Sequence, residues 1–233
     1  VGSYESLMAA IQAGANSVYF GIDKLNMRSR SASNFSTEDL RKIVKICQEN
    51  NVKSYLTVNT VIYNDDIELM HEIVDTAKEV NVSAIIAADV AVMLYAFEKG
   101  VEVHLSTQLN IANVEALKFY ARYADVVVLA RECNMEQVAQ IWKAIQDEKI
   151  CGPNGELIKI EMFCHGALCM AVSGKCYLSL HELNASANRG ACYQVCRHGY
   201  RLIDDERDIE IKVDNQYLMS PKDLKTIHFL NKM

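Results

Sequence analysis

The chain has 233 residues, of which 50% are hydrophobic, and its formal net charge is −6 at pH 7. This length allows one large domain or two small ones with an ample core. The negative charge argues against a protein that grips nucleic acid through its overall charge. The sequence contains neither a signal-peptide core nor a run of about 18 apolar residues, which predicts a cytoplasmic protein without a membrane span.

Short apolar runs alternate with amphipathic segments along most of the chain. The apolar runs predict buried strands at Asn16–Ile22, Lys53–Thr57, Ser83–Ala87, Val101–Leu105, Asp125–Leu129 and Leu157–Phe163. Helical periodicity predicts helices at Glu5–Ala13, Ser36–Asn50, Asp65–Val80, Val90–Lys99, Asn113–Tyr123 and Met135–Asp147.

This alternation predicts an α/β fold with a parallel sheet, most simply a TIM-like (β/α) barrel that is incomplete because its outer strands are missing. A doubly wound open sheet is the alternative, but no G-x-G-x-x-G turn follows any of the strands. The chain has two prolines and no low-complexity linker, so we expect a single domain over residues 1–233.

A cysteine-rich segment with a hairpin, residues 164–213, follows the last predicted strand and is expected to be an insertion late in the barrel. Tyr200–Ile203 and Ile209–Val213 flank the turn-like run DDERD and predict the β-hairpin. A helix is predicted at Pro221–Leu230, where the alternation of elements resumes.

Five of the eight cysteines lie between Cys164 and Cys196, spaced C-x4-C-x6-C-x15-C-x3-C. Thiolates bind soft metals and iron–sulfur clusters, so the segment predicts a metal cofactor. A disulfide framework is disfavoured because the chain is long enough to build its own core. The spacing leaves both a 4Fe-4S cluster and structural zinc open, although zinc ribbons usually present two tight C-x2-4-C pairs.

Polar residues follow most of the predicted strands, where a barrel brings side chains together at one face. Taken singly, most such residues are helix caps or turn formers. Together they predict a polar pocket with the cysteines at its rim. They are Asn26, Arg28, Asn59, Asp89, Ser106, Thr107, Gln108, Asn110, Arg131, Glu132, Glu161 and His165.

The charged residues between Gly174 and Arg201, apart from histidines, are four basic to one acidic. Such a segment is either a local basic surface that receives an anion or simply a solvated face.

The run E-M-F-C-H-G-A-L-C-M-A-V-S-G-K-C-Y-L-S at residues 161–179 matches every specified position of the signature of the peptidase U-32 family, the collagenase-like proteins. Other blocks also resemble this family, so the likeness spans the whole chain. They are AAIQAGANSVYFG at 9–21, LNMRSR at 25–30, STQLN at 106–110, NRGACYQVCR at 188–197 and YLMSPKDL at 217–224.

The resemblance implies chemistry as well as fold. The family was named for proteolysis, but many members are understood as oxygen-independent hydroxylation proteins with a 4Fe-4S cluster. Some of these act on tRNA or rRNA bases, with prephenate implicated as the source of the hydroxyl group, and others act on a quinone precursor. The family's cluster cysteines fall on Cys169, Cys176, Cys192 and Cys196, which leaves Cys164 as a non-ligand.

Three features of the family are absent: an opening strand, a closing strand and a C-terminal domain. Its barrels begin with a strand close to L-A-P-A-G and end with one close to F-K-I-E-G-R, and many members add a C-terminal domain. We therefore expect this chain to be an excerpt of a longer protein.

Three functions are compatible with these patterns. The first is hydroxylation of a base in tRNA or rRNA, with RNA and a small carboxylate such as prephenate as partners. The second is a peptidase, although neither G-x-S-x-G nor H-E-x-x-H occurs. The third is a non-catalytic iron–sulfur or zinc scaffold.

The first function assigns roles to individual residues. Arg28, Arg131 or Arg189 would pair with carboxylate or phosphate. Glu161 or His165 would act as acid or base, with Arg131 beside them in the catalytic group. The remaining substrate-binding candidates are the amide side chains of Asn26, Asn59, Gln108 and Asn110.

Overall fold

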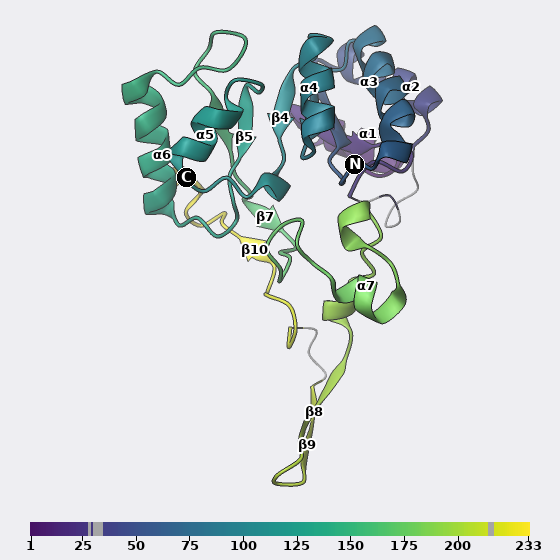
Figure 1. Cartoon of the computed structure of the whole chain (residues 1–233), viewed down its shortest axis with the longest axis vertical. Helices are drawn as coiled ribbons and strands as arrows, with labels where there is room; N and C mark the ends of the chain where they lie inside the picture. The colour runs from purple at the N-terminus through teal and green to yellow at the C-terminus, as the bar shows by residue number, and fades with distance from the viewer. Residues whose placement is uncertain (28, 30–34, 214–216) are drawn as a thin grey trace.

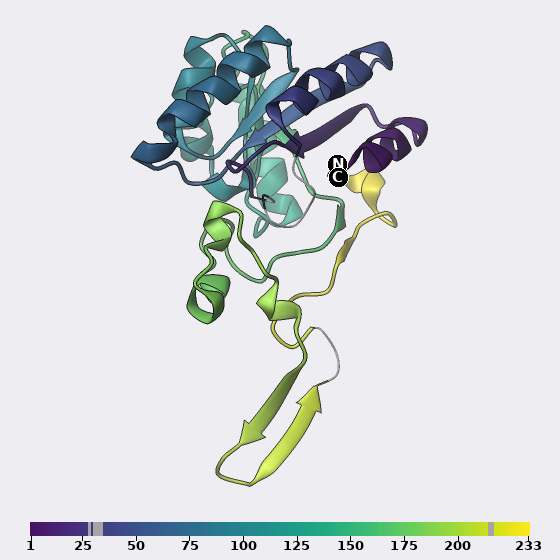
Figure 2. The ribbon, with the colours of Figure 1, turned by 90° about the vertical axis from the view of Figure 1, so that its right-hand side faces the viewer.

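The structure is a computed structural model, and it describes residues 1–27, 29, 35–213 and 217–233. A layered α/β body contains the first two thirds of the chain (Figures 1 and 2). The cysteine segment, here residues 164–197, lies against one end of that body. The hairpin of residues 200–213 extends away from it in both views.

Six parallel strands form the sheet of the body, in the order β1-β2-β3-β4-β5-β6. Each strand therefore pairs with its neighbour in sequence, as in a (β/α) barrel, and the order never reverses as it does in a doubly wound sheet. The predicted fold class, a truncated TIM-like barrel, is confirmed. The strands are β1 (Ser17–Gly21), β2 (Lys53–Val58), β3 (Ala84–Ala87), β4 (Val103–Leu105), β5 (Val126–Val128) and β6 (Lys159–Glu161).

The six predicted helices of the body are present and cover the outer face of the curled sheet (Figure 2). Their starts follow from local chemistry: Ser36 and Asp39 form a reciprocal capping box, and Asn134 and Gln137 form another. They are α1 (Tyr4–Gln12), α2 (Thr37–Glu49), α3 (Ile67–Glu79), α4 (Val90–Glu98), α5 (Val114–Tyr120) and α6 (Met135–Glu148).

The hydrophobic core lies between these helices and the sheet. Leu56, Ile85 and Leu105, from three neighbouring strands, are fully buried, and burial of each such side chain stabilises the fold by roughly 1.5–3 kcal/mol. Cys47 is buried on the core face of α2, as expected for a small hydrophobic residue. Among the described residues beyond Ile158, Ala187 is the only buried hydrophobic one.

The last third of the chain forms small elements. They are β7 (His165–Gly166), α7 (Leu178–Leu183), β8 (Tyr200–Asp204), β9 (Ile209–Val213), β10 (Leu224–Lys225) and the 3-10 turns η3 (Ala187–Arg189), η4 (Val195–Arg197) and η5 (Leu230–Lys232). Two further 3-10 turns, η1 (Asn64–Asp66) and η2 (Thr107–Leu109), lie in the body. β8 and β9 pair antiparallel, which confirms the predicted hairpin.

The predicted helix at Pro221–Leu230 is wrong. Leu224 and Lys225 instead form β10, which pairs antiparallel with β7. Thr226 donates from both its backbone N–H and its hydroxyl to the carbonyl of Cys164, at 3.1 and 2.8 Å. Backbone groups that a helix would satisfy internally are used for this tertiary pairing, so the contact with β7 overrides the local helical pattern.

Across the part of the chain that the structure describes, none of the helices combines the length and the apolar character needed to cross a bilayer.

Candidate functional site

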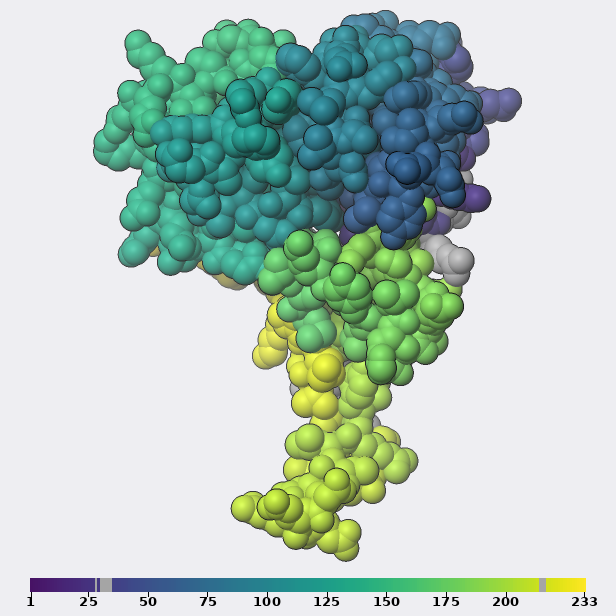
Figure 3. Space-filling view, viewed as in Figure 1, coloured from purple at the N-terminus to yellow at the C-terminus, as the bar shows by residue number. Residues whose placement is uncertain are grey.

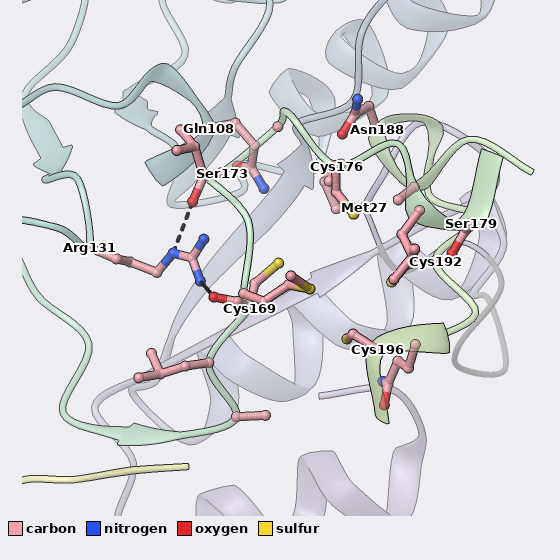
Figure 4. Close-up of a pocket in the computed structure, with 18 of the residues that line it drawn as sticks. Met27, Gln108, Arg131, Cys169, Ser173, Cys176, Ser179, Asn188, Cys192 and Cys196 are labelled. Carbon is pink, nitrogen blue, oxygen red and sulfur yellow. Dashed lines mark hydrogen bonds between the residues drawn. The ribbon is translucent and has the colours of Figure 1, made fainter. Parts of the chain in front are cut away.

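Four cysteines line one cavity of about 250 Å³ where the cysteine segment meets the sheet, and this space is the cysteine cavity from here on. Cys169, Cys176, Cys192 and Cys196 are directed into it from different sides (Figure 4). Cys164 does not line it. The structure therefore brings together the four cysteines that the family resemblance selects and leaves the fifth apart.

The cavity thiols affect one another electrostatically. Burial, followed by the charges of Cys169 and Cys192, raises the pKa of Cys196, and Arg197 opposes that shift. All eight cysteines of the chain are free thiols, so no disulfide ties the segment together.

The four cysteines can be compared with the ligand sets of two groups, a structural zinc ion and a 4Fe-4S cluster. A structural zinc ion holds four ligands at about 2.3 Å for sulfur around one centre. Among the described residues, no three His, Cys, Asp or Glu side chains are grouped closely enough to hold a metal ion. A 4Fe-4S cluster attaches each thiolate to a different iron, so its ligands surround a larger body. Four thiols around one cavity supply the number of ligands that a 4Fe-4S cluster needs, and the same number suits zinc.

Arg131, a predicted catalytic residue, binds the first half of the cysteine segment. Its guanidinium donates to the Ser173 hydroxyl at 2.9 Å and to the Cys169 carbonyl at 3.2 Å (Figure 4). A third hydrogen bond goes to the Ala171 carbonyl at 2.8 Å. Asn110 adds a hydrogen bond of 2.9 Å from its side chain to the Ser173 carbonyl. Both residues, predicted to contact substrate, are thus engaged with the chain itself.

Arg189 is likewise engaged, on the second half of the segment. It forms an ion pair with Asp66, with Nη1–Oδ2 at 2.5 Å, and donates to the Val61 carbonyl at 2.6 Å. Its guanidinium also stacks on the Tyr63 ring, 4.4 Å from the centroid. Hydrogen bonding to Arg189 lowers the pKa of Asp66. The guanidinium of Arg189, which was expected to bind an anionic substrate, is therefore already paired with a carboxylate of the chain. The other predicted anion-binding arginine, Arg28, lies outside the described residues.

Gly190 follows Arg189 and lies close to the loop after β1. Its φ of +83° is in the left-handed region, and a Cβ there would collide with the carbonyl of Asn26 and the hydroxyl of Ser29. A side chain at this position would therefore push the second half of the segment off the body.

A second cavity of about 460 Å³ opens inside the curled sheet and is called the barrel pocket. Six of the polar residues expected at the barrel mouth line it: Asn26, Asn59, Ser106, Thr107, Gln108 and Glu161. It shares its wall with the cysteine cavity through Met27, Thr107, Gln108 and Phe163. The two cavities thus adjoin, with the four cysteines on one side of the shared wall and polar side chains such as Asn59 and Glu161 on the other.

Hydrogen bonds hold the polar wall of the barrel pocket. The Asn59 side chain accepts from the Met27 N–H at 3.1 Å and donates to the Ser106 hydroxyl at 3.4 Å. Ser106 in turn donates to the Gln108 side chain. Asn26 is buried, and its amide donates to the carbonyls of Ile22 and Asp23 at 3.2 and 3.3 Å, so it shapes the loop after β1.

The two predicted acid–base residues are placed differently. Glu161 ends β6 and faces the barrel pocket. His165 lies in β7, is exposed, and lines neither cavity.

Sequence reasoning missed Ser173 and Asp66, the partners of the two arginines. Ser173 is an ordinary residue between two cysteines, and Asp66 begins a helix, where a carboxylate needs no other explanation. No pattern in the sequence marks either residue.

A partial (β/α) barrel with a thiol-lined cavity at its mouth is the class that this fold and site define. The family model described as "Peptidase family U32" matches residues 2–233, and the chain belongs to that family. A solved structure of a U32 peptidase shares the fold, with a TM-score of 0.52 and 16% identity over 61% of this chain and 62% of that one.

Two curated relatives carry different names. A "Collagenase" of Porphyromonas gingivalis is 69% identical over 100% of this chain and 56% of its own length. The "tRNA hydroxylation protein P1" of Bacillus subtilis is 33% identical over 100% of this chain and 54% of its own length. The chain thus spans about half the length of these relatives.

Proposed function

We propose that the protein containing this chain hydroxylates a base in tRNA or rRNA, using a 4Fe-4S cluster held by Cys169, Cys176, Cys192 and Cys196. The observation that carries the proposal is the shared wall: the four-cysteine cavity and the barrel pocket have lining residues in common, among them Gln108 and Phe163. A relative named for tRNA hydroxylation, aligned over the whole chain, supports the choice of RNA. A cytoplasmic location, where thiols stay reduced, belongs to the same proposal.

The barrel pocket would bind and orient the base. Asn59 and Ser106 present hydrogen-bonding groups fixed by their mutual contact, and Phe163 offers an apolar surface on the shared wall. A base seated against Gln108 would therefore lie directly beside the cysteine cavity. When bound, the cluster supplies one-electron chemistry, and the residues of the pocket supply orientation and exclude water.

Glu161 is the side chain best placed to move a proton. It faces the barrel pocket at the carboxyl end of β6, the end where barrel enzymes gather their reacting groups. Its charge is also close enough to Tyr55, lower in the same sheet, to contribute to the raised pKa of that phenol, after burial and Glu102. A small carboxylate such as prephenate remains the proposed source of the hydroxyl group.

A peptidase is the second candidate, because the relative with 69% identity is named a collagenase. Proteolysis by a side-chain nucleophile needs a base within hydrogen-bonding reach of it. Among the described residues that line the two cavities there is no histidine. His104, the most deeply buried histidine, lies inside the sheet and pairs with Glu102 at 2.9 Å. A Cys–His pair, the arrangement that activates a peptidase thiol, is therefore absent from the described lining of the two cavities, and this favours the hydroxylase.

The test uses the full-length gene in its own organism. Deletion is expected to remove a hydroxylated nucleoside from digested tRNA or rRNA, measured by mass spectrometry. The wild-type gene and a Cys164→Ser variant should restore it, and Cys176→Ala should not. Unchanged nucleosides together with peptide cleavage by purified Cys176→Ala protein would favour the peptidase. Unchanged nucleosides and no cleavage, with iron still bound to the wild type, would indicate a scaffold.

A further inference from the structure

Three arginines hold the cysteine segment in place. They differ in whether a carboxylate pairs with the guanidinium. Arg189 pairs with Asp66, and Arg197 pairs with Asp223 at 3.1 Å. Arg131 is the exception: within the described part of the chain it has no carboxylate within salt-bridge distance, and its three hydrogen bonds go to neutral oxygens. Of these three, Arg131 alone has no ion-pair partner among the described residues, and it lines the cysteine cavity.

The geometry of Arg131 also differs from that of a solvent-facing arginine. It follows β5 in the body, yet its three bonded groups belong to Cys169, Ala171 and Ser173 on the other wall of the cavity. A guanidinium is a planar fork with fixed donor directions, so three acceptors around it fix the position of the loop that carries them. The Cys169 carbonyl is one of these acceptors, which places the clamp directly on a cavity cysteine.

A fixed charge at this position has an electrochemical consequence. Four thiolates make any iron–sulfur group in the cavity anionic, and reduction adds one more negative charge. A nearby cation stabilises the reduced form more than the oxidised one, because the attraction grows with the negative charge. Net charge and hydrogen bonding around the cluster are the terms that set its potential.

We propose that Arg131 is the positioning and charge-balancing residue of the cysteine cavity. Its fork clamps the loop from Cys169 to Ser173, and its unpaired charge raises the reduction potential of the group that the four cysteines hold. This inference rests on the proposed cofactor for its second half only. The clamp is a property of the chain itself.

Three variants of the full-length, anaerobically purified protein separate the two effects. Arg131→Lys keeps the charge but loses the fork, and Arg131→Gln loses both. Ser173→Ala removes one hydrogen bond and keeps the charge. Arg122→Gln is the matched control, since Arg122 is exposed on the body and donates to the Phe119 carbonyl at 3.1 Å.

The clamp is read from amide exchange at residues 169–174 in metal-free protein. Loss of two or more hydrogen bonds, each contributing about 1 kcal/mol, predicts at least about tenfold faster exchange in Arg131→Lys and Arg131→Gln. Ser173→Ala should show a smaller increase, and Arg122→Gln should show none. Exchange equal to wild type in both Arg131 variants would overturn the clamp.

The charge effect is read from iron and sulfide content and from a redox titration followed by visible absorbance. The midpoint potential should fall in Arg131→Gln and stay near wild type in Arg131→Lys and Ser173→Ala. Equal potentials in wild type and Arg131→Gln would refute the charge effect. A wild-type protein that binds no iron or sulfide would instead overturn the proposed cofactor and the charge effect together, while the exchange result still decides the clamp.

Discussion

The body and the cysteine segment are held together by different forces. Every residue of β3, β4 and β5 is buried, so the sheet is stabilised by its apolar contacts with the helices. In the segment and the hairpin below it, most side chains are exposed, and the space-filling view shows a narrow extension beneath a compact body (Figure 3). Burial of apolar side chains therefore stabilises the body, whereas arginine contacts and, in the proposed function, a bound cluster order the cysteine segment.

The largest expected effect comes from removing that bound group. If the cluster orders the segment, chelation of iron from the full-length protein should greatly increase amide exchange over residues 169–197. Exchange in β2–β5 should change little, because those strands rest on buried apolar contacts. Hydrogen–deuterium exchange with mass spectrometry measures both regions in one experiment. Equal protection of the segment with and without iron would show that the arginine contacts suffice.

The contrast between the body and the cysteine segment also explains which parts of the fold the sequence predicts. Each strand of the body was predicted because a buried parallel strand needs a local apolar run, such as the one that contains Ile85. Pro221–Leu230 was misassigned because β10 forms only through pairing with β7. Arg189 was assigned to substrate because its partner, Asp66, lies 123 positions earlier in the chain. Local patterns do not report such contacts.

The candidate site shows the same limit. The spacing of the cysteines indicates metal binding but leaves zinc and a cluster open, and the choice of four among five came from family resemblance. The structure adds the shared cavity, which depends on how α7 and η4 fold back toward the body. The polar rim was predictable because side chains after parallel strands meet at one end of a barrel.

Substitution of a buried leucine in the body should lower the free energy of unfolding more than the same substitution in the hairpin. Both effects should be smaller than that of removing the cluster. Leu56→Ala removes a fully buried side chain from β2 and should lower the free energy of unfolding by about 2–5 kcal/mol. Leu202→Ala, in the exposed hairpin strand β8, deletes the same atoms at a site that is 54% exposed and should cost less than about 1 kcal/mol. Urea titration monitored by circular dichroism gives both values. Similar losses in the two variants would mean that the hairpin is covered in the full-length protein.

The smallest effect concerns the ion pair that joins the two regions. Arg189 lowers the pKa of Asp66 in the folded protein, so this carboxylate contributes stability that is present above its unfolded pKa, about 4. That stability is lost as the pH falls through the depressed folded value. Asp66→Asn should therefore lower the free energy of unfolding by on the order of 1 kcal/mol at pH 7 and by progressively less below about pH 4.

Glu79→Gln is the control, because it removes a carboxylate paired with Arg41 on the exposed surface of the body. Unfolding titrations at pH 7 and pH 3 measure the global effect, and amide exchange at η3 measures the local one. Only Asp66→Asn should loosen η3, and a pH-independent loss there would show that Asp66 acts through packing alone.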